Sequence, residues 1–253
     1  MKRTFVLLFS ILFCVIKTSA QIFTDKAQIE FEVVSNIKKN MGDNDWADQM
    51  GDKLPTLKKE YYDFTFADNK SMYMFNRLAD KDKYPEWMRR SENKSKWFSD
   101  FNSGTVNIEK EMFGSMFNVS DSLPKMEWRL VNENRVIAGF NCKKAVSKIF
   151  DSVYVFAFYT DEIMIPGGPN NINGLPGMIM GLTIPRLFTS WIATKVSVNA
   201  IDVSIIKPTT AKKYYTNNSL KTLIEDRTKD WWSGDESEEN RQQKNRFIWS
   251  TLL

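Results

Sequence analysis

The sequence contains no histidine, and this absence excludes several kinds of functional site. Without imidazole there is no Ser-His-Asp triad, no Cys-His dyad and no histidine-ligated metal. Imidazole is also the commonest general base near neutral pH. The composition therefore favours a non-enzymatic protein over an enzyme, and it indicates neither a metal nor a cofactor.

Cysteine is almost absent as well, since the chain has only Cys14 and Cys142. Cys14 lies in an N-terminal segment that we expect to be removed, so no internal disulfide is expected in the mature chain. Cys142 is interpreted as a buried thiol, because free cysteine is usually buried. The alternative is a thiolate activated by Lys144, which shares its strand face, whereas Lys143 points to the other face.

A strong net charge is also missing. The whole chain has 35 basic and 31 acidic residues, and removal of Lys2, Arg3 and Lys17 with the first twenty residues leaves 32 against 31. This balance argues against a nucleic-acid-binding protein. The content of 42% hydrophobic and 13% aromatic residues excludes a disordered chain and predicts a substantial core.

Long hydrophobic runs are limited to the N-terminus. Two basic residues precede twelve uncharged and mainly apolar residues at 5–16, and small residues end the segment at Ala20. This is the pattern of a secretory signal peptide, and twelve residues are too few to span a bilayer. We therefore expect a signal peptide at 1–20, a single domain at 21–253, and no transmembrane span in the mature chain.

Alternating apolar residues predict a series of strands. Turn residues between them predict antiparallel hairpins, including a long one with its turn at 132–134. The segment 152–160 is apolar on both faces and is expected in the centre of the sheet, with its second face against a helix or a cavity. The strands are expected at 28–34, 60–67, 71–76, 97–101, 106–117, 126–131, 136–150, 152–160 and 178–184.

The C-terminal part, 209–253, changes to helical spacing. A helix is predicted over 219–232 with Ser219 as its N-cap, and a tail at 241–253 is expected to pack against the sheet. Strands followed by helices indicate an α+β domain. We expect a β-dominated fold, with a curved antiparallel sheet or half-open barrel and the C-terminal helices packed on it.

The segment 166–182 contains five of the eleven glycines and three of the eight prolines. It has neither a dinucleotide-binding nor a P-loop pattern, so a phosphate site is not favoured. Clustered glycine and proline usually specify a turn. The segment is therefore interpreted as a sharp corner before the strand at 178–184.

This corner also carries a family resemblance. Gly174-Leu175-Pro176-Gly177-Met178-Ile179 resembles the Gly-Leu-Pro-Gly-Leu-Ile signature of the GLPGLI family of exported bacterial proteins, with Met178 in place of leucine. Over residues 126–198 the chain is similar to this family in further landmarks, which are Trp128 and the Gly-aromatic-x-Cys-Lys-Lys element with Gly139, Cys142, Lys143 and Lys144.

The resemblance implies a signal-bearing, β-rich envelope protein of a Gram-negative bacterium, in the periplasm or at the outer-membrane periphery. It implies no catalytic residue. We expect a non-enzymatic binding or structural protein that holds an apolar, lipid-like ligand or a segment of a partner envelope protein.

Two alternatives stay open. One is a carboxylate-dependent hydrolase that uses Asp151, Asp161 or Glu162 near strand ends. The other is Cu(I) binding by the methionine pairs Met72 and Met74 or Met178 and Met180, because thioethers favour Cu(I).

Overall fold

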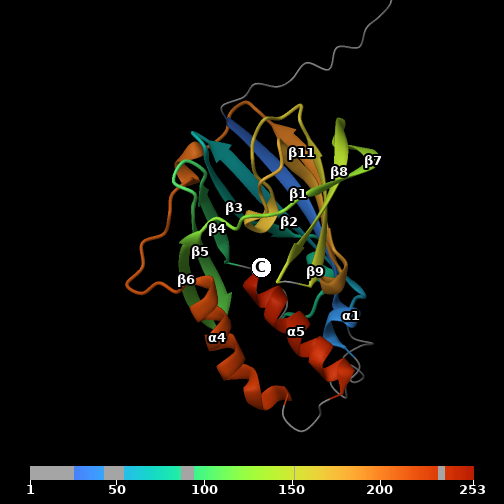
Figure 1. Ribbon diagram of the computed structural model, residues 1–253, viewed down its shortest axis with the longest axis vertical. Helices are drawn as coiled ribbons and strands as arrows, with labels where there is room; N and C mark the ends of the chain where they lie inside the picture. Colours follow the sequence, from blue (N-terminus) through green and yellow to red (C-terminus); the bar gives the residue numbers. More distant parts are fainter. Residues whose placement is uncertain (1–25, 43–53, 87–93, 151, 233–236) are drawn as a thin grey trace, which may run out of the picture.

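The computed structural model describes residues 26–42, 54–86, 94–150, 152–232 and 237–253. In this part of the chain one sheet of eleven strands has the order β6-β5-β4-β3-β2-β1-β11-β10-β9-β8-β7, and all neighbours are antiparallel (Figure 1). The strands are β1 (Lys26–Asn36), β2 (Leu57–Ala67), β3 (Lys70–Leu78), β4 (Lys96–Asp100), β5 (Thr105–Met112), β6 (Ser115–Ser122), β7 (Arg129–Ile137), β8 (Phe140–Ile149), β9 (Val153–Thr160), β10 (Met178–Ile184) and β11 (Thr189–Ser197).

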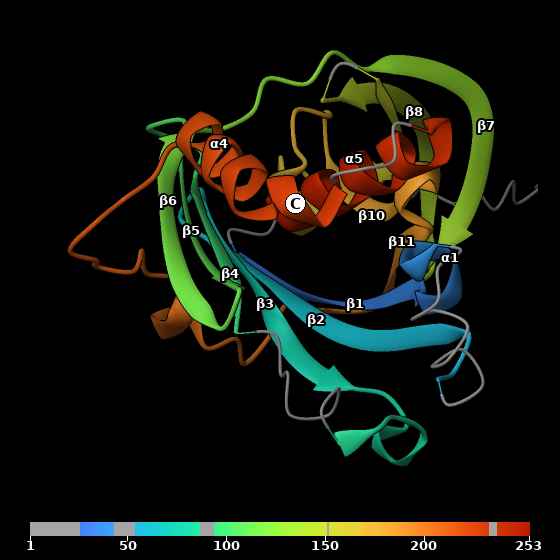
Figure 2. The ribbon, with the colours of Figure 1, turned by 90° about the horizontal axis from the view of Figure 1, so that it is seen from below.

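The sheet consists of two meanders, β1 to β6 and β7 to β11, which are joined by the pairing of β1 with β11. β6 and β7 lie at its two ends, so the sheet is strongly curved but not closed (Figure 2). The helices α4 (Asn217–Thr228) and α5 (Glu238–Leu252) lie on its concave side, and the short α1 (Ile37–Met41) follows β1. The expected α+β fold with a curved antiparallel sheet and C-terminal helices is confirmed.

The concave face carries the main core. On β1 the alternate residues Ala27, Ile29, Phe31 and Val33 are buried, as the period of a half-buried strand requires. Aromatic rings continue this face across the next strands, with Tyr73 stacked on Tyr62 at 5.1 Å between ring centroids. The helices add Leu220, Ile224 and Ile248, which are all buried. The core therefore lies between the sheet and the helices, and burial replaces the missing disulfide.

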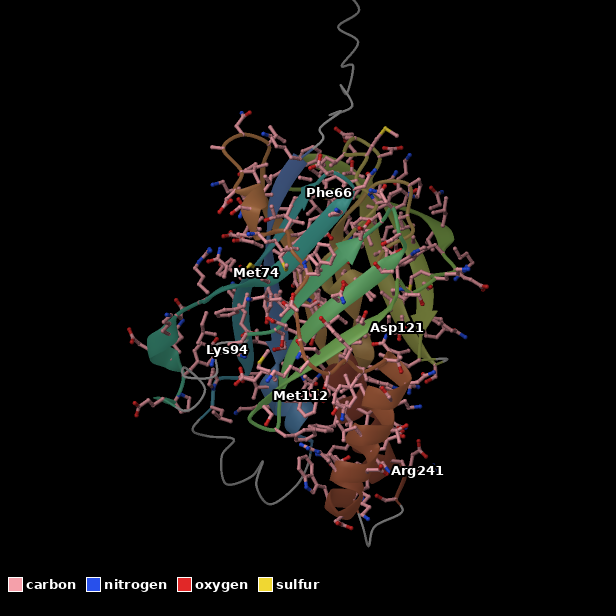
Figure 3. The ribbon with its side chains drawn as sticks, turned by 90° about the vertical axis from the view of Figure 1, so that its left-hand side faces the viewer. Phe66, Met74, Lys94, Met112, Asp121 and Arg241 are labelled. Atoms are coloured by element: carbon pink, nitrogen blue, oxygen red, sulfur yellow. The ribbon has the colours of Figure 1, made fainter. Side chains whose placement is uncertain are left out.

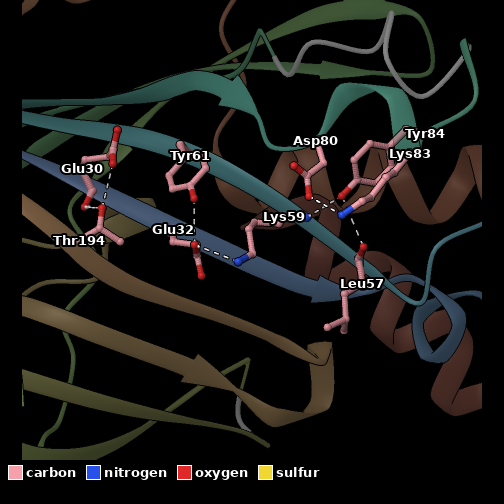
Figure 4. A network of polar contacts seen from close by, with 9 residues as sticks. All are labelled: Glu30, Glu32, Leu57, Lys59, Tyr61, Asp80, Lys83, Tyr84 and Thr194. Atoms are coloured by element: carbon pink, nitrogen blue, oxygen red, sulfur yellow. Dashed lines mark hydrogen bonds and ion pairs between the residues drawn. The ribbon is translucent and has the colours of Figure 1, made fainter.

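The convex face of β1 and β2 is polar and hydrogen-bonded (Figure 4). Tyr61 donates its hydroxyl hydrogen to Glu32 at 3.0 Å, and Lys59 pairs with the same carboxylate at 3.1 Å. Thr194 of β11 donates to Glu30 at 2.9 Å, and Arg77 also pairs with Glu30. The hydrogen bond from Arg77 lowers the pKa of Glu30 and keeps it ionised. These groups satisfy one another, so this face is a solvated surface.

Two expected hairpins differ from the structure. The strand expected at 106–117 is two strands, β5 and β6, because Phe113 and Gly114 have φ values of 51° and 70° and form a tight turn. The turn expected at 132–134 is instead a bulge in β7, and the chain turns at Ala138 and Gly139. β11 was not expected at all.

The expected burial of both faces of 152–160 is confirmed for Phe158 and Thr160 on the outer face, which are buried, and is wrong for Tyr154 at the start of that face. β9 is paired on both sides, and its inward residues Val153, Val155 and Ala157 are fully buried. On the other face Tyr154 is 48% exposed. Cationic side chains cover this face instead of a helix, and the Arg135 guanidinium lies 4.6 Å from the ring of Phe158.

The helical part also needs one correction. α4 begins after Thr216, which accepts a hydrogen bond from the backbone of Ser219, while Ser219 accepts one from the backbone of Thr216. Ser219 is therefore the third helical residue of a capping box and not the N-cap. The expected packing of the tail at 241–253 is confirmed by α5. In the described ranges no helix has the length and hydrophobicity that a bilayer crossing requires.

Candidate functional site

The concave face and the helices do not fill the space between them. A cavity of about 560 Å³ lies between β4, β5, the end of β8 and the C-terminal residues of α5. Its apolar wall includes Trp97, Val106, Ile108, Ile149 and Leu252. The large aromatic and branched residues of a curved sheet cannot interdigitate fully with two helices, so a void remains.

The rim of this apolar cavity is basic. Lys125, Lys148 and Lys221 line it, and no acidic side chain of the described residues does. All three lysines are exposed. Lys148 directs its ammonium group over the Tyr154 ring on the outer face, and Lys221 lies 3.8 Å from Glu225, so the positive potential at the entrance comes mainly from Lys125.

A second, smaller cavity of about 350 Å³ adjoins the first one, and Trp97, Asn170 and Leu253 line both. Two lysines and one acid line it, Lys58, Lys110 and Glu60. Lys58 pairs with Glu60 at 2.8 Å. Lys110 is thus the excess positive charge of the smaller cavity.

Lys110 occupies a core position on β5. The residues on its strand face, Val106, Ile108 and Met112, are all buried, and Lys110 itself is 6% exposed. Figure 3 shows Met112 at the end of this strand near the helices. Among the described residues Lys110 Nζ has no hydrogen-bond partner. Burial alone lowers its pKa to about 7.

The backbone of the glycine-rich corner passes so close to the end of β9 that a side chain would not fit at Gly177. Gly177 has a φ of 147°, and a Cβ atom at this residue would lie 2.1 Å from the carbonyl oxygen of Thr160. Gly174 has a φ of 90°, and Trp128 Nε1 donates to the carbonyl of Asn173 at 2.8 Å. The buried side chains of Leu175, Met178 and Ile179 anchor the corner in the core. Pro176 lies between two of these anchored positions.

The second motif element lies on β8. Cys142 is fully buried, and desolvation raises the pKa of its thiol to about 11, so the buried protonated thiol is the better interpretation. Lys143 pairs with Asp161 at 2.6 Å and Lys144 with Glu133 at 2.5 Å. Gly139 has a φ of 87° in the β7–β8 turn.

Two of these motif residues reach the β9–β10 connection, since Trp128 contacts the corner and Lys143 pairs with Asp161 next to it, whereas Lys144 pairs with Glu133 of β7. None of them lines the two cavities. The motif therefore stabilises the fold, and the cavity residues were not singled out from the sequence. The alternation on β5 could have revealed Lys110, because this lysine interrupts an apolar face.

The described carboxylates of the hydrolase alternative are engaged in structural contacts. Asp161 is held by Lys143, whose hydrogen bond lowers the pKa of the carboxyl, and Glu162 accepts a hydrogen bond from the backbone of Asn141 at 2.9 Å. Asp151 lies outside the described residues. Met72 and Met74 lie on β3, Met178 and Met180 lie on β10, and Cu(I) binding by either pair stays a prediction. Within the described ranges no three His, Cys, Asp or Glu side chains are grouped as metal ligands.

Replacement of Gly177 should harm the fold. Gly177→Val places a branched side chain against the Thr160 carbonyl, so we expect a loss of at least about 3 kcal/mol in the free energy of unfolding. Gly114→Ala is the control, because its Cβ would meet nothing within 4 Å. It should cost only about 1 kcal/mol from the positive φ. Urea unfolding measures both, and equal losses would show that the close approach does not matter.

Lys110 should make stability depend on pH. Between its folded pKa of about 7 and its ordinary value of 10.5 the unfolded chain binds more protons, so stability increases with pH in this window. Lys110→Met removes this effect. Its stability advantage over the wild type should be largest at about pH 6 and should shrink by roughly 4 kcal/mol towards about pH 10.

The control for this experiment is Lys195→Met, an exposed lysine on β11. The difference in the free energy of unfolding between this variant and the wild type should not change with pH across the same range. An equally flat difference for Lys110→Met would show that Lys110 is solvated or paired in solution.

Comparisons with known proteins give a fold likeness. No family model matches the chain, and no curated protein matches it. A structure of PNGF-II in space group C2 superposes with a TM-score of 0.52 over 78% of this chain at 15% identity, and one in space group P21 gives 0.51 over 76% at 15%.

In both cases the matched part is 32% of PNGF-II, so this chain spans about a third of that protein. An uncharacterized conserved protein from Thermus thermophilus has a TM-score of 0.39 at 6% identity, with 76% of this chain and 90% of that chain covered. The likeness to PNGF-II concerns the fold alone.

Proposed function

We propose that this chain is an exported envelope protein of the GLPGLI type that binds an apolar small molecule between its sheet and its C-terminal helices. The observation that carries the proposal is the cavity of about 560 Å³ with its apolar wall. Ligand sites usually have volumes of roughly 300–1,000 Å³ and a mainly apolar lining with few polar groups.

The position of the cavity supports a ligand rather than a partner segment. Helices α4 and α5 already cover the concave face, so a further helix or strand has no free sheet face there (Figure 2). The space that remains is bounded by side chains from the sheet, the segment 169–172 and both helices. A compact or chain-like molecule fits such a space better than a folded segment.

The proposed localisation rests on the N-terminal sequence and on the motif at 174–179. A basic start, an apolar stretch and small residues before position 21 form a signal-peptide pattern. An aqueous periplasm solvates apolar molecules poorly, so a protein that encloses such a molecule would allow it to cross this compartment.

The localisation predicts a defined processing site. When the full chain is expressed in a Gram-negative host, we expect the mature protein in the periplasmic fraction with Gln21 as its first residue. Intact-mass measurement of the purified protein checks this. A cytoplasmic product that keeps Met1 would contradict it.

Filling the cavity should abolish binding. The delipidated protein is titrated with a fluorescent fatty acid, and we expect saturable binding to the wild type. Val106→Trp places a large side chain in the cavity and should weaken binding at least about tenfold, because the ligand and the new ring compete for one volume. Thermal unfolding shows whether the variant is folded.

The matched control is Asn107→Trp. Asn107 is the next residue on β5 and points to the opposite face of the sheet, so this variant should bind within about twofold of the wild type. Absence of saturable binding to the wild type would refute the carrier function. Equal weakening by both tryptophans would place the ligand elsewhere.

A further inference from the structure

Lys110 has an environment that an unliganded core does not explain. It lies among apolar residues on the concave face of β5, and its ammonium group has no hydrogen-bond acceptor among the described residues. The Trp97 ring lies beside this ammonium group, but a buried charge without a hydrogen-bond acceptor still costs on the order of several kcal/mol. The protein would be more stable with methionine at this position, so the lysine needs another explanation.

A second buried donor lies next to Lys110. Lys110 Nζ is 5.5 Å from the centre of the Trp97 ring, and Trp97 is 4% exposed. The indole Nε1 of Trp97 also has no hydrogen-bond partner in the described structure. Tryptophan and lysine can only donate hydrogen bonds. Two neighbouring donors therefore lack an acceptor.

No acidic side chain of the described residues is hydrogen-bonded to these two donors. Glu60 is the acidic side chain of the smaller cavity, and it is paired with Lys58 at 2.8 Å. The remaining positive charge is that of Lys110. A ligand with one negative charge and acceptor oxygens would complement it.

The two cavities adjoin each other, and their linings differ. Trp97, Asn170 and Leu253 line both of them. The larger cavity has the apolar wall, and the smaller one has Lys110. A ligand with an apolar tail in the first cavity would place its head in the second one.

We propose that Lys110 and Trp97 form the headgroup site for a long-chain carboxylic acid, whose carboxylate accepts hydrogen bonds from Lys110 Nζ and Trp97 Nε1 while its hydrocarbon chain occupies the apolar cavity. This inference rests on the proposed function. The binding is non-covalent, and the carboxylate supplies the counter-charge that the core lacks. A hydrogen bond between charged groups at buried side chains such as Lys110 and Trp97 is stronger than one at the surface.

The exposed lysines at the rim have a different role. Lys125, Lys148 and Lys221 are solvated, and exposed ion pairs contribute little to affinity. The proposal therefore assigns the head of the ligand to Lys110 and not to these lysines.

The test compares ligands that differ only in the headgroup. Hexadecanoic acid, methyl hexadecanoate and hexadecanol each displace a neutral, uncharged fluorescent probe from the delipidated full chain. The wild type should bind the acid at least about tenfold more tightly than the alcohol or the ester. Acetate in large excess should not displace the probe, which separates a long-chain ligand from a free small carboxylate.

Four variants locate the head. Lys110→Met should weaken binding of the acid at least about tenfold. Binding of the alcohol should stay within about threefold of the wild type, because only the charged contact is lost. Trp97→Phe removes the Nε1 donor but keeps an aromatic ring, and it should weaken binding of the acid several-fold. Lys221→Met and Lys125→Met, at the rim, should keep the preference for the acid. Thermal unfolding confirms that each variant is folded.

The outcomes separate this inference from the proposed function. Equal binding of acid and alcohol to the wild type would refute the headgroup site and leave the apolar carrier intact. Loss of the preference in Lys221→Met but not in Lys110→Met would place the carboxylate at the rim and overturn the proposal. No binding of any of the three ligands, or of the probe, would refute the carrier function and this inference with it.

Discussion

The concave face of the sheet presents more apolar surface than two helices can cover by close packing. Curvature brings the inward side chains of many strands towards a common centre, and the aromatic ones, such as Tyr73 and Trp97, are too large and rigid to fill every gap. Helices α4 and α5 lie over this face (Figure 2), and their residues Leu220, Ile224 and Ile248 are buried. The two adjoining cavities are part of the space that the helices leave open.

Within this interior Lys110 is a charged residue at a position where an apolar side chain would give a more stable fold. Every other residue on its strand face is apolar, whereas Lys110 brings a charge into the same layer. The cost is visible in its lowered pKa, because burial disfavours the protonated form. Groups that lower the stability of a fold without an internal partner are often part of a binding site. A ligand that supplies the missing acceptor would account for both observations.

The conspicuous sequence motif has a separate role. Gly177 and Gly174 let the chain pass close to β9 and to Trp128, and Lys143 pairs with Asp161 beside the same connection. These contacts fix how β9 is followed by β10, and therefore how the second meander reaches β11. The motif sets the geometry of the sheet, while the residues at the cavities set what the sheet can hold.

Local patterns in the chain were enough to predict the fold class, most strands, the helical C-terminus and the corner before Met178. They misplaced the turns at 113–114 and 138–139, because apolar alternation continues through them and cross-strand pairing selects the turn. The pairing of β1 with β11, the cavities and the isolation of Lys110 depend on residues far apart in the chain, such as Trp97 and Leu253. Periodicity shows which side of a strand faces inward, but not which side chains meet there or how much space they leave.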